Sequence, residues 1–253
     1  MTKKMYYGKF ISFLLCLAIT LFGFALGLGG LFFYKTSSEI SKIKVYTLGE
    51  ISFHFLELGN ENTGDCTYIK AGDADILIDA GSNYTSIPTI TAYINSQVKD
   101  NKLEYVIVTH AHKDHYAGFA TNFATKSIFD MYEIGTIIDF AQTEDGKTKQ
   151  DMYKNYQREL SEAVGRGTTH YTALDCVNKI NGATDTFELS KDIKMTILKQ
   201  KYYEIQDKTN ENNHSVCTLF THGDKNFLFT GDLDLEGEES LVELNNLPKC
   251  ELY

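Results

Sequence analysis

"VTHAHKDHYAG", residues 108–118, is the stretch that decides the fold, because it places three histidines and an aspartate within six residues. The whole chain of 253 residues contains only seven histidines. Clustered imidazoles repel one another when protonated and gain little from packing when neutral, so a shared metal ion is the natural partner. The stretch therefore predicts a metal site, and the rest of the chain must supply the remaining ligands.

The apolar segment "KLEYVIVTH", residues 102–110, runs directly into this cluster. A short continuous apolar run is typical of a strand that is buried on both faces. His110 and His112 lie two residues apart, so in an extended segment they point to the same side. Asp114 and His115 follow where the chain turns from strand to helix, a position at which α/β sheets commonly build sites. Imidazole and carboxylate together suit zinc, with iron or manganese as alternatives.

The remaining apolar patterns predict a layered α/β arrangement, in which strands come in pairs, then alternate with helices, then pair again. Tight hairpin turns are expected at Gly72-Asp73 and Gly223-Asp224. The expected strands lie within residues 51–59, 66–82, 102–110, 134–139, 185–199, 214–232 and 249–253, and the expected helices within residues 86–99, 116–127, 148–167 and 235–246.

The amino-terminal segment predicts a membrane anchor. Residues 10–34 carry no charge and follow a tail with three lysines, whereas about 20 apolar residues are enough to span a membrane. Because preceding lysines favour a cytoplasmic amino terminus, we expect a cytoplasmic tail (1–9), a single-pass signal-anchor (10–34), a linker with the first strand (35–50) and an extracytoplasmic domain (51–253). A cleaved signal peptide with a secreted domain is the alternative.

Charge is divided unequally along the chain. Residues 1–44 hold six lysines and one glutamate, a net charge of +5, so residues 45–253 carry −15 and the chain as a whole −10. Duplex binding depends on neutralising several phosphates with basic side chains. Bulk electrostatic binding of nucleic acid is therefore not expected, and such a substrate would need a local basic groove or the metal itself.

His110-x-His112-x-Asp114-His115 resembles the signature of metallo-β-lactamase-fold hydrolases. Two further stretches, "ILIDAGS" and "FLFTGD", follow in the order expected for that family, and the resemblance covers residues 51–253. It implies an αββα sandwich that binds two divalent metal ions. It also implies that Asp79 supports the metal-binding loop from behind the ligands, and that Asp232 bridges the two metals.

Within the family, the chain looks most like the extracellular hydrolase domain of competence-type DNA-internalisation proteins and their stand-alone relatives. The stretch "NENNHSVCTLFTHGDKNFLFTGD" contributes to this resemblance. In the wider family, a histidine from this region completes the first metal site. In the competence-type branch, the local pattern is rich in asparagine and ends in serine, as it does here. His214 is therefore either a ligand or a loop residue flanked by Asn213 and Ser215, which would contact the substrate.

These observations together predict a two-metal hydrolase, with zinc as the first expectation and manganese or iron as alternatives. The six expected ligands are three imidazoles for one ion, a carboxylate and an imidazole for the other, and a bridging carboxylate: His110, His112 and His214, Asp114 and His115, and Asp232. Asp114 and Asp232 are the carboxylates expected to act in catalysis. A metal-bound hydroxide would attack a phosphodiester of nucleic acid or of a cell-envelope polymer, with a lactam or lactone as the alternative substrate.

One feature departs from the family pattern. In these families a further histidine, usually within His-His-Gly, follows the strand after the Gly-Asp motif. The sequence here ends at "KCELY", residues 249–253, where that strand begins. We therefore expect a carboxy-terminally incomplete sandwich with an incomplete second metal site, most simply a fragment. The alternative is a non-catalytic membrane-anchored module with a degenerate site.

Overall fold

The apolar segment that ends at Val108 forms strand β5 (Lys102–Val108), about which the larger sheet of this computed structural model is organised. The structure describes residues 43–58, 64–81, 83–121 and 125–253. Among them, no helix has the length and apolarity that crossing a membrane requires. The expected cytoplasmic tail and the expected anchor at residues 10–34 lie outside the described residues. Residues 44–253 form one structural unit.

The larger sheet has seven strands in sequence order, β1 to β7, and the pairing of its strands changes from antiparallel to parallel at β4. Strands β1 to β4 pair antiparallel, and strands β4 to β7 pair parallel. Parallel neighbours need long crossover connections, which is why the helices occur in this half. The strands other than β5 are β1 (Lys44–Leu48), β2 (Ile51–Phe55), β3 (Thr67–Ala71), β4 (Ala74–Ile78), β6 (Glu133–Asp139) and β7 (Thr169–Thr172).

The smaller sheet has four antiparallel strands in the order β11, β10, β9, β8. Their bounds are β8 (Thr186–Ser190), β9 (Ile193–Ile197), β10 (Thr218–His222) and β11 (Lys225–Phe229). Both hairpin turns expected from sequence are confirmed, because Gly72 and Gly223 occupy them with φ of +59° and +60°. That left-handed backbone conformation costs glycine little and other residues more.

The two sheets face each other across an aromatic core. The ring centroid of Phe53 in β2 lies 5.9 Å from that of Phe220 in β10. It lies 4.7 Å and 5.3 Å from the ring centroids of Phe227 and Phe229 in β11. Phe53, Phe220 and Phe227 have no exposed surface. The burial of these large side chains is what joins the sheets, because apolar area removed from water is the dominant favourable contribution to folding.

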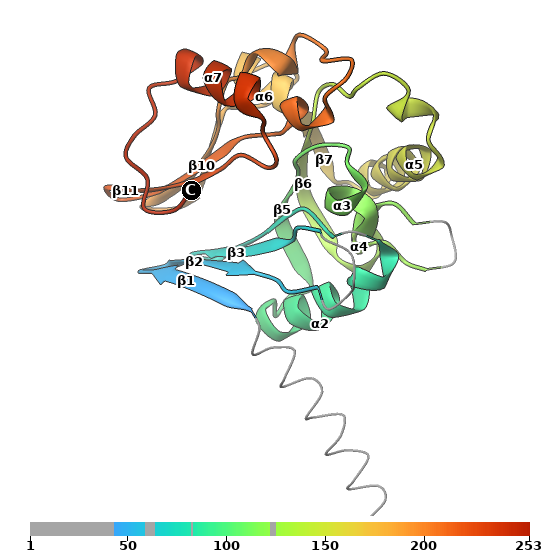
Figure 1. The fold of residues 1–253 in the computed structure, drawn as a ribbon. Coiled ribbons are helices and arrows are strands. Elements are labelled where there is room, and N and C mark those ends of the chain that lie inside the picture. Colours follow the sequence, from blue (N-terminus) through green and yellow to red (C-terminus); the bar gives the residue numbers. More distant parts are fainter. Residues whose placement is uncertain (1–42, 59–63, 82, 122–124) are drawn as a thin grey trace, which may run out of the picture. The chain divides into compact units, whose positions relative to one another are not determined.

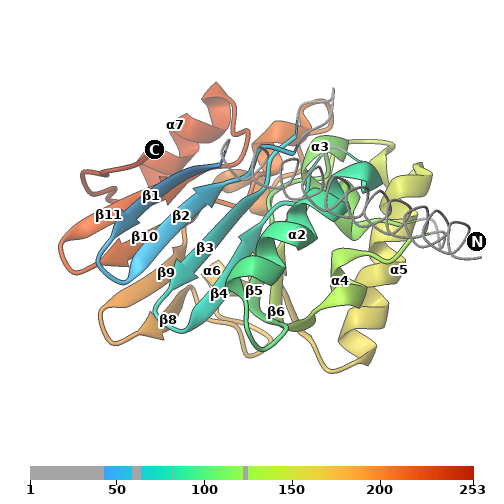
Figure 2. The ribbon, with the colours of Figure 1, turned by 90° about the horizontal axis from the view of Figure 1, so that it is seen from below.

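Helices cover the outer face of each sheet, which gives the four-layer αββα order (Figures 1 and 2). Tyr93 of one helix packs on Tyr68 of β3, and Leu241 of another packs with Leu228 of β11. Helices α2, α4 and α5 accompany the larger sheet and α6 and α7 the smaller one, with the bounds α2 (Ile87–Gln97), α4 (Ile128–Met131), α5 (Asp151–Gly165), α6 (Ala173–Asn178) and α7 (Leu235–Leu244). The chain thus has the mixed α/β sandwich expected from its sequence.

The prediction of a helix within residues 116–127 is wrong. Helix α3 (Lys113–Tyr116) stops after four residues and is followed by a single 3-10 turn, η2 (Ala117–Phe119). The Gly118 amide donates to the Ala80 carbonyl at 3.1 Å, and a Cβ at Gly118 would lie 2.5 Å from that oxygen. This close approach to the turn after β4 diverts the chain, so the helical pattern is not propagated.

Three smaller differences follow from tertiary pairing. Strand β7 and helix α6 were not expected, because their short segments carry no clear periodicity. The strand expected at residues 249–253 is represented by one parallel bridge between Leu252 and Phe227. Three further 3-10 turns, η3 (Lys147–Lys149), η4 (Lys201–Tyr203) and η5 (Glu211–His214), lie in the long connections.

The aromatic core generates a stability prediction. Replacing Phe53 with Ala should lower the free energy of unfolding by about 3–5 kcal/mol, because it leaves a cavity between the sheets. Tyr84, whose side chain is half exposed, provides the control, and Tyr84→Ala should change the free energy by no more than about 0.5 kcal/mol. Chemical denaturation of both variants measures the difference, and equal effects would contradict the proposed core.

Candidate metal centre

The parallel strands end at a common edge, and the candidate site lies there. Ile78 at the end of β4 is in register with Ile107 of β5, and Val108 at the end of β5 is in register with Asp139 of β6. The residues that follow β4 and β5 are Asp79 and Thr109. Carboxyl ends of strands are where open α/β sheets build their sites, so the sheet itself brings the two motifs together.

Asp79 anchors the metal-binding loop. Its Oδ1 accepts the backbone N–H of Thr109 at 2.8 Å, and its Oδ2 accepts the Thr109 hydroxyl at 2.7 Å and His115 Nδ1 at 2.8 Å. The backbone of Asp79 is left-handed, with φ of +59°, and only 2% of the residue is exposed. Aspartate tolerates this conformation better than most residues. Asp79 thus contacts the metal-binding loop from behind, and its role in supporting metal ligands stays a prediction.

A hydrogen-bond chain fixes the tautomer of His110. The Thr109 hydroxyl donates to Asp79, so its oxygen accepts from His110 Nδ1 at 3.0 Å. The lone pair of His110 is then on Nε2, which lies 3.0 Å from His112 Nδ1. Burial, together with the neighbouring His115 and His112, lowers the pKa of His110 well below its usual value. His110 is thus held neutral with its lone pair directed into the cluster, as a metal ligand requires.

His115 lies between two carboxylates. Its Nδ1 bonds Asp79, and its Nε2 lies 3.2 Å from Asp232 Oδ2. Burial acts to lower the pKa of His115, but the hydrogen bonds to Asp232 and Asp79 outweigh it and raise the pKa to about 11. The same hydrogen bond lowers the pKa of the Asp232 carboxyl against the effect of its partial burial.

The cluster fits a divalent cation. Ligand atoms of His110, His115 and Asp232 all lie within 4.8 Å of one another, and His112 adds a fourth side chain through its contact with His110. We call these four residues the metal centre. Its donor set combines imidazole nitrogen with carboxylate oxygen, the combination that zinc and similar ions accept once the imidazoles are deprotonated. The support of a ligand histidine by a carboxylate on its other ring nitrogen is also typical of such sites.

Two expected ligands lie outside this tight group. Asp114 is half-buried in α3. His214 is fully buried, and its Nε2 accepts the backbone N–H of Asp207 at 3.0 Å. His214 Nδ1 faces Glu211 Oε2 at 3.8 Å, too far for a hydrogen bond. The ligand roles of Asp114 and His214 remain predictions.

Asn213 and Ser215, expected to contact substrate, are instead internal. Both are almost completely buried. The Asn213 amide donates to Asp207 Oδ2 at 2.9 Å, and the Ser215 side chain packs beneath Gly231. In this structure the two residues shape the loop around His214, and their contact with substrate stays a prediction.

Two residues at the site were not singled out as site residues from sequence. The backbone of Asp65 donates to the Asp114 carbonyl at 3.1 Å and accepts from the Gly81 amide at 2.8 Å, which ties it to the metal-binding loop. Burial raises the pKa of Asp65; the nearby His115 acts in the opposite direction, and neighbouring carboxylates reinforce the rise. Glu211 is buried behind the loop. The local sequence signal for Asp65 was a Gly-Asp pair before a strand. No local sequence pattern pointed to Glu211.

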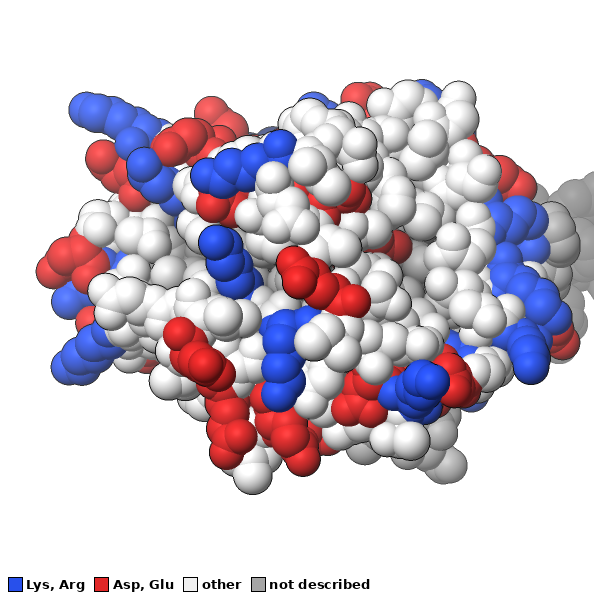
Figure 3. All heavy atoms as spheres, turned by 90° about the horizontal axis from the view of Figure 1, so that it is seen from above, with Lys and Arg blue, Asp and Glu red and all other residues white. Residues whose placement is uncertain are grey.

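The acidic unit presents both signs of charge at its surface. Figure 3 shows a face on which lysine and arginine side chains are interspersed with aspartate and glutamate. Salt bridges such as Lys194 to Glu188, at 2.9 Å, pair some of these charges. The net charge of −15 is therefore not concentrated on this face in a single acidic patch.

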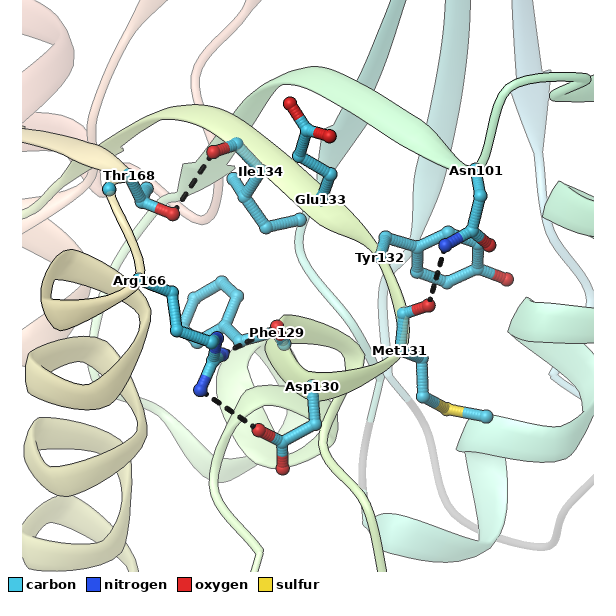
Figure 4. Close-up of a pocket in the computed structure, with 10 residues that line it drawn as sticks. Asn101, Phe129, Asp130, Met131, Tyr132, Glu133, Ile134, Arg166 and Thr168 are labelled. Atoms are coloured by element: carbon cyan, nitrogen blue, oxygen red, sulfur yellow. Dashed lines mark hydrogen bonds and ion pairs between the residues drawn. The ribbon is translucent and has the colours of Figure 1, made fainter.

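A cavity of about 430 Å³ lies at the other end of the larger sheet (Figure 4). It is lined by residues at the amino ends of β5 and β6, among them Asn101 and Glu133. Arg166 there donates a hydrogen bond to the Phe129 carbonyl at 2.8 Å and forms a salt bridge with Asp130 at 3.3 Å. A smaller cavity of about 250 Å³ includes Asp65, Asp79, Thr109 and Gly231 in its lining, and Asp79 connects it to the metal centre through its bond to His115.

A sandwich of two sheets with a histidine-rich centre at the carboxyl ends of parallel strands defines a metal-binding α/β protein. Comparison with known families agrees, because residues 59–122 match the family model of the metallo-beta-lactamase superfamily. The matched residues include β4, β5 and the histidine motif, so this part of the chain is similar to the metallo-β-lactamase superfamily, as its motifs indicated.

Individual relatives match only in part. Exodeoxyribonuclease WalJ of Streptococcus pneumoniae, in two strains, is 31% identical over 85 residues. That match covers 34% of this chain and 30% of the relative, so the chain spans less than a third of the relative's length. Among solved structures, a probable metal-dependent hydrolase from Staphylococcus aureus is 14% identical with a TM-score of 0.40 and 74% of both chains covered. The dizinc quorum-quenching lactonase AidC is 11% identical with a TM-score of 0.45. That match covers 74% of this chain and 73% of the AidC chain.

The protonation of His115 generates a prediction for the metal-free protein. Because its folded pKa of about 11 exceeds the unfolded value, its stabilising effect is complete below the unfolded pKa of about 6.5 and is lost as pH rises through the folded pKa. Asp232 acts in the opposite direction, since its lowered pKa makes its contribution disappear only in acid. Denaturation in chelator should therefore show the free energy of unfolding decreasing between about pH 7 and pH 10.

The variant His115→Gln provides the comparison, since it cannot take up that proton. We expect its free energy of unfolding to vary much less with pH over the same interval. If the wild type and this variant showed the same slope, the ion pairs of His115 would not be the cause.

Proposed function

We propose that this protein is a metal-dependent hydrolase that cleaves a phosphodiester. The observation that carries the proposal is the convergence of His110, His112, His115 and Asp232 within the metal centre. When bound, divalent ions activate water as a nucleophile and neutralise charge that develops on the substrate. The residues around the ions must then hold the ions in place and orient the reacting groups.

The side chains divide into two sets in this proposal. His110 and His112, whose Nε2 and Nδ1 atoms face each other, would hold the first ion. Asp114 and His115 would hold the second ion, and Asp232 would contribute to both. We place His214 with the first set. Asp114 and Asp232 are the carboxylates that act in catalysis, because they fix the ions against the reacting atoms.

Behind these ligands, hydrogen bonds orient two of the histidine rings. Thr109 holds the proton of His110 on Nδ1, and Asp79 holds the proton of His115 on Nδ1. Each ring therefore presents Nε2 to the centre. A protein nucleophile is not part of the proposal, since no G-x-S-x-G stretch occurs in the sequence.

The substrate class is supported by two observations. The matched stretch of 85 residues is shared with a protein named as an exodeoxyribonuclease, and the sequence motifs resemble the competence-type branch. The net charge of −15 over residues 45–253 disfavours gripping a long duplex by bulk electrostatics. We therefore propose that a short stretch or an end of a phosphodiester polymer, of nucleic acid or of the cell envelope, enters the site.

The location of the protein forms part of the same proposal. The uncharged residues 10–34, which lie outside the described residues, would anchor the chain in the membrane with residues 51–253 on the outer side. An envelope-linked or incoming polymer is the kind of substrate that a domain in that place would meet.

Side-by-side assays test the function. The purified chain loaded with Zn²⁺ or Mn²⁺ should hydrolyse bis(p-nitrophenyl) phosphate or an end-labelled single-stranded oligonucleotide faster than a lactone or a lactam. His112→Ala should lower kcat/KM by at least about 100-fold, because ions contribute several kcal/mol to such reactions. The control His222→Gln changes a histidine at the far end of β10, which bonds the Leu48 carbonyl, and should keep full activity.

The proposal would be overturned by turnover that survives both His112→Ala and prolonged chelation. Faster cleavage of the lactone or the lactam than of either phosphodiester would keep the metal chemistry but replace the substrate class.

A further inference from the structure

Glu211 is a buried carboxylate that the proposed reaction does not use. It lies at the start of η5, and its side chain has no exposed surface. A carboxylate in such a place is costly unless strong hydrogen bonds satisfy it. The identity of its partners therefore shows what the residue does.

Both oxygens of Glu211 accept backbone amides from distant segments. Oε1 accepts the N–H of Ala111 at 2.8 Å, across 100 positions of sequence. Oε2 accepts the N–H of Glu144 at 2.8 Å. Ala111 stands between His110 and His112, so the first of these bonds grips the centre of the metal-binding loop.

Glu211 also lies beside the third imidazole. Because His214 Nε2 accepts the Asp207 amide, the proton of the neutral ring is on Nδ1. That nitrogen is buried without a hydrogen-bond partner among the described residues, and Glu211 Oε2 lies 3.8 Å from it. An unsatisfied buried donor costs free energy. A shift that closed this gap would give the carboxylate-to-imidazole bond that supports ligand histidines.

We propose that Glu211 is the positioning residue of the first metal site: one carboxylate holds the His110–His112 loop by its central amide and aligns His214 as the third ligand. With an ion bound, the Nδ1–H of His214 would donate a hydrogen bond to Glu211, and Nε2 would be free of the Asp207 amide to act as a ligand. No bond is made or broken except these hydrogen bonds and the ligand contact. The inference rests on the proposed function, since it requires an ion at His110 and His112.

The isosteric variant Glu211→Gln separates this role from simple packing. Glutamine keeps the shape but has one acceptor oxygen, so its NH₂ group must face either the Ala111 or the Glu144 amide, donor against donor. The loop is then released on one side. Loss of such a supporting partner costs about 10–100-fold in metal affinity.

Glu159 offers a matched control. It is also buried, and its carboxylate accepts the hydroxyls of Thr121 at 2.9 Å and Ser127 at 2.8 Å, away from the metal-binding loop. Glu159→Gln should destabilise the fold while leaving metal affinity within about twofold of the wild type, because it touches no ligand or ligand-bearing loop.

The experiment measures Zn²⁺ affinity of the full chain by competition with a chelating dye, well below the melting temperature of each variant in chelator. We expect Glu211→Gln to weaken the tightest-bound ion by about 10–100-fold, and His214→Ala to do the same. The double variant should lose less than the product of the two single losses, because part of the effect of Glu211 acts through His214. A purely structural role would lower the melting temperature without producing this coupling.

The possible failures are distinguishable. If the wild type binds neither Zn²⁺ nor Mn²⁺, both the proposed function and this inference are wrong. If the wild type binds Zn²⁺ and Glu211→Gln binds as tightly as Glu159→Gln, only this inference is overturned. Should Glu211→Gln not fold, His214→Ala decides, because unchanged affinity in that variant removes the alignment of His214 on which the inference depends.

Discussion

The carboxylate of Asp79 is the interaction on which the rest of the metal centre depends. It satisfies the backbone and hydroxyl of Thr109 and one nitrogen of His115 with three bonds of 2.7 to 2.8 Å. A buried charge is tolerated only when it is fully hydrogen-bonded, and here its partners are the residues that orient His110 and His115. Asp79 therefore holds the end of β4, the left-handed turn and the two imidazoles together.

The two halves of the centre differ in charge for physical reasons. The ring of His110 has no exposed surface, so desolvation, reinforced by the neighbouring His115 and His112, lowers its pKa and keeps it neutral. His115 has a carboxylate on each side, which outweighs the same desolvation. Asp65 adds further negative charge near His115. The centre therefore has a nitrogen-rich half and a carboxylate-rich half.

Long-range hydrogen bonds assemble this centre from four separate segments. Val216 donates to the Thr109 carbonyl at 2.9 Å, which ties the segment before β10 to the metal-binding loop. Glu211 makes a second tie to Ala111 at 2.8 Å. Asp232 arrives from the end of β11, on the opposite sheet. The contact of the two sheets, through Phe53 and its neighbours, is therefore a condition for the site as well as for stability.

The sequence by itself determined the elements whose cause is local. The apolar run of β5, the glycine turns of the two hairpins and the spacing of His110, His112 and His115 are each readable from neighbouring residues. Only the tertiary structure decided what depends on distant partners: the early end of α3, forced by the contact of Gly118 with Ala80, and the buried places of Asn213 and Ser215. Periodicity reports which face of an element is apolar, but not which segment will cover that face. A residue such as Glu211, whose partners lie 67 and 100 positions away, therefore leaves no trace in a local pattern.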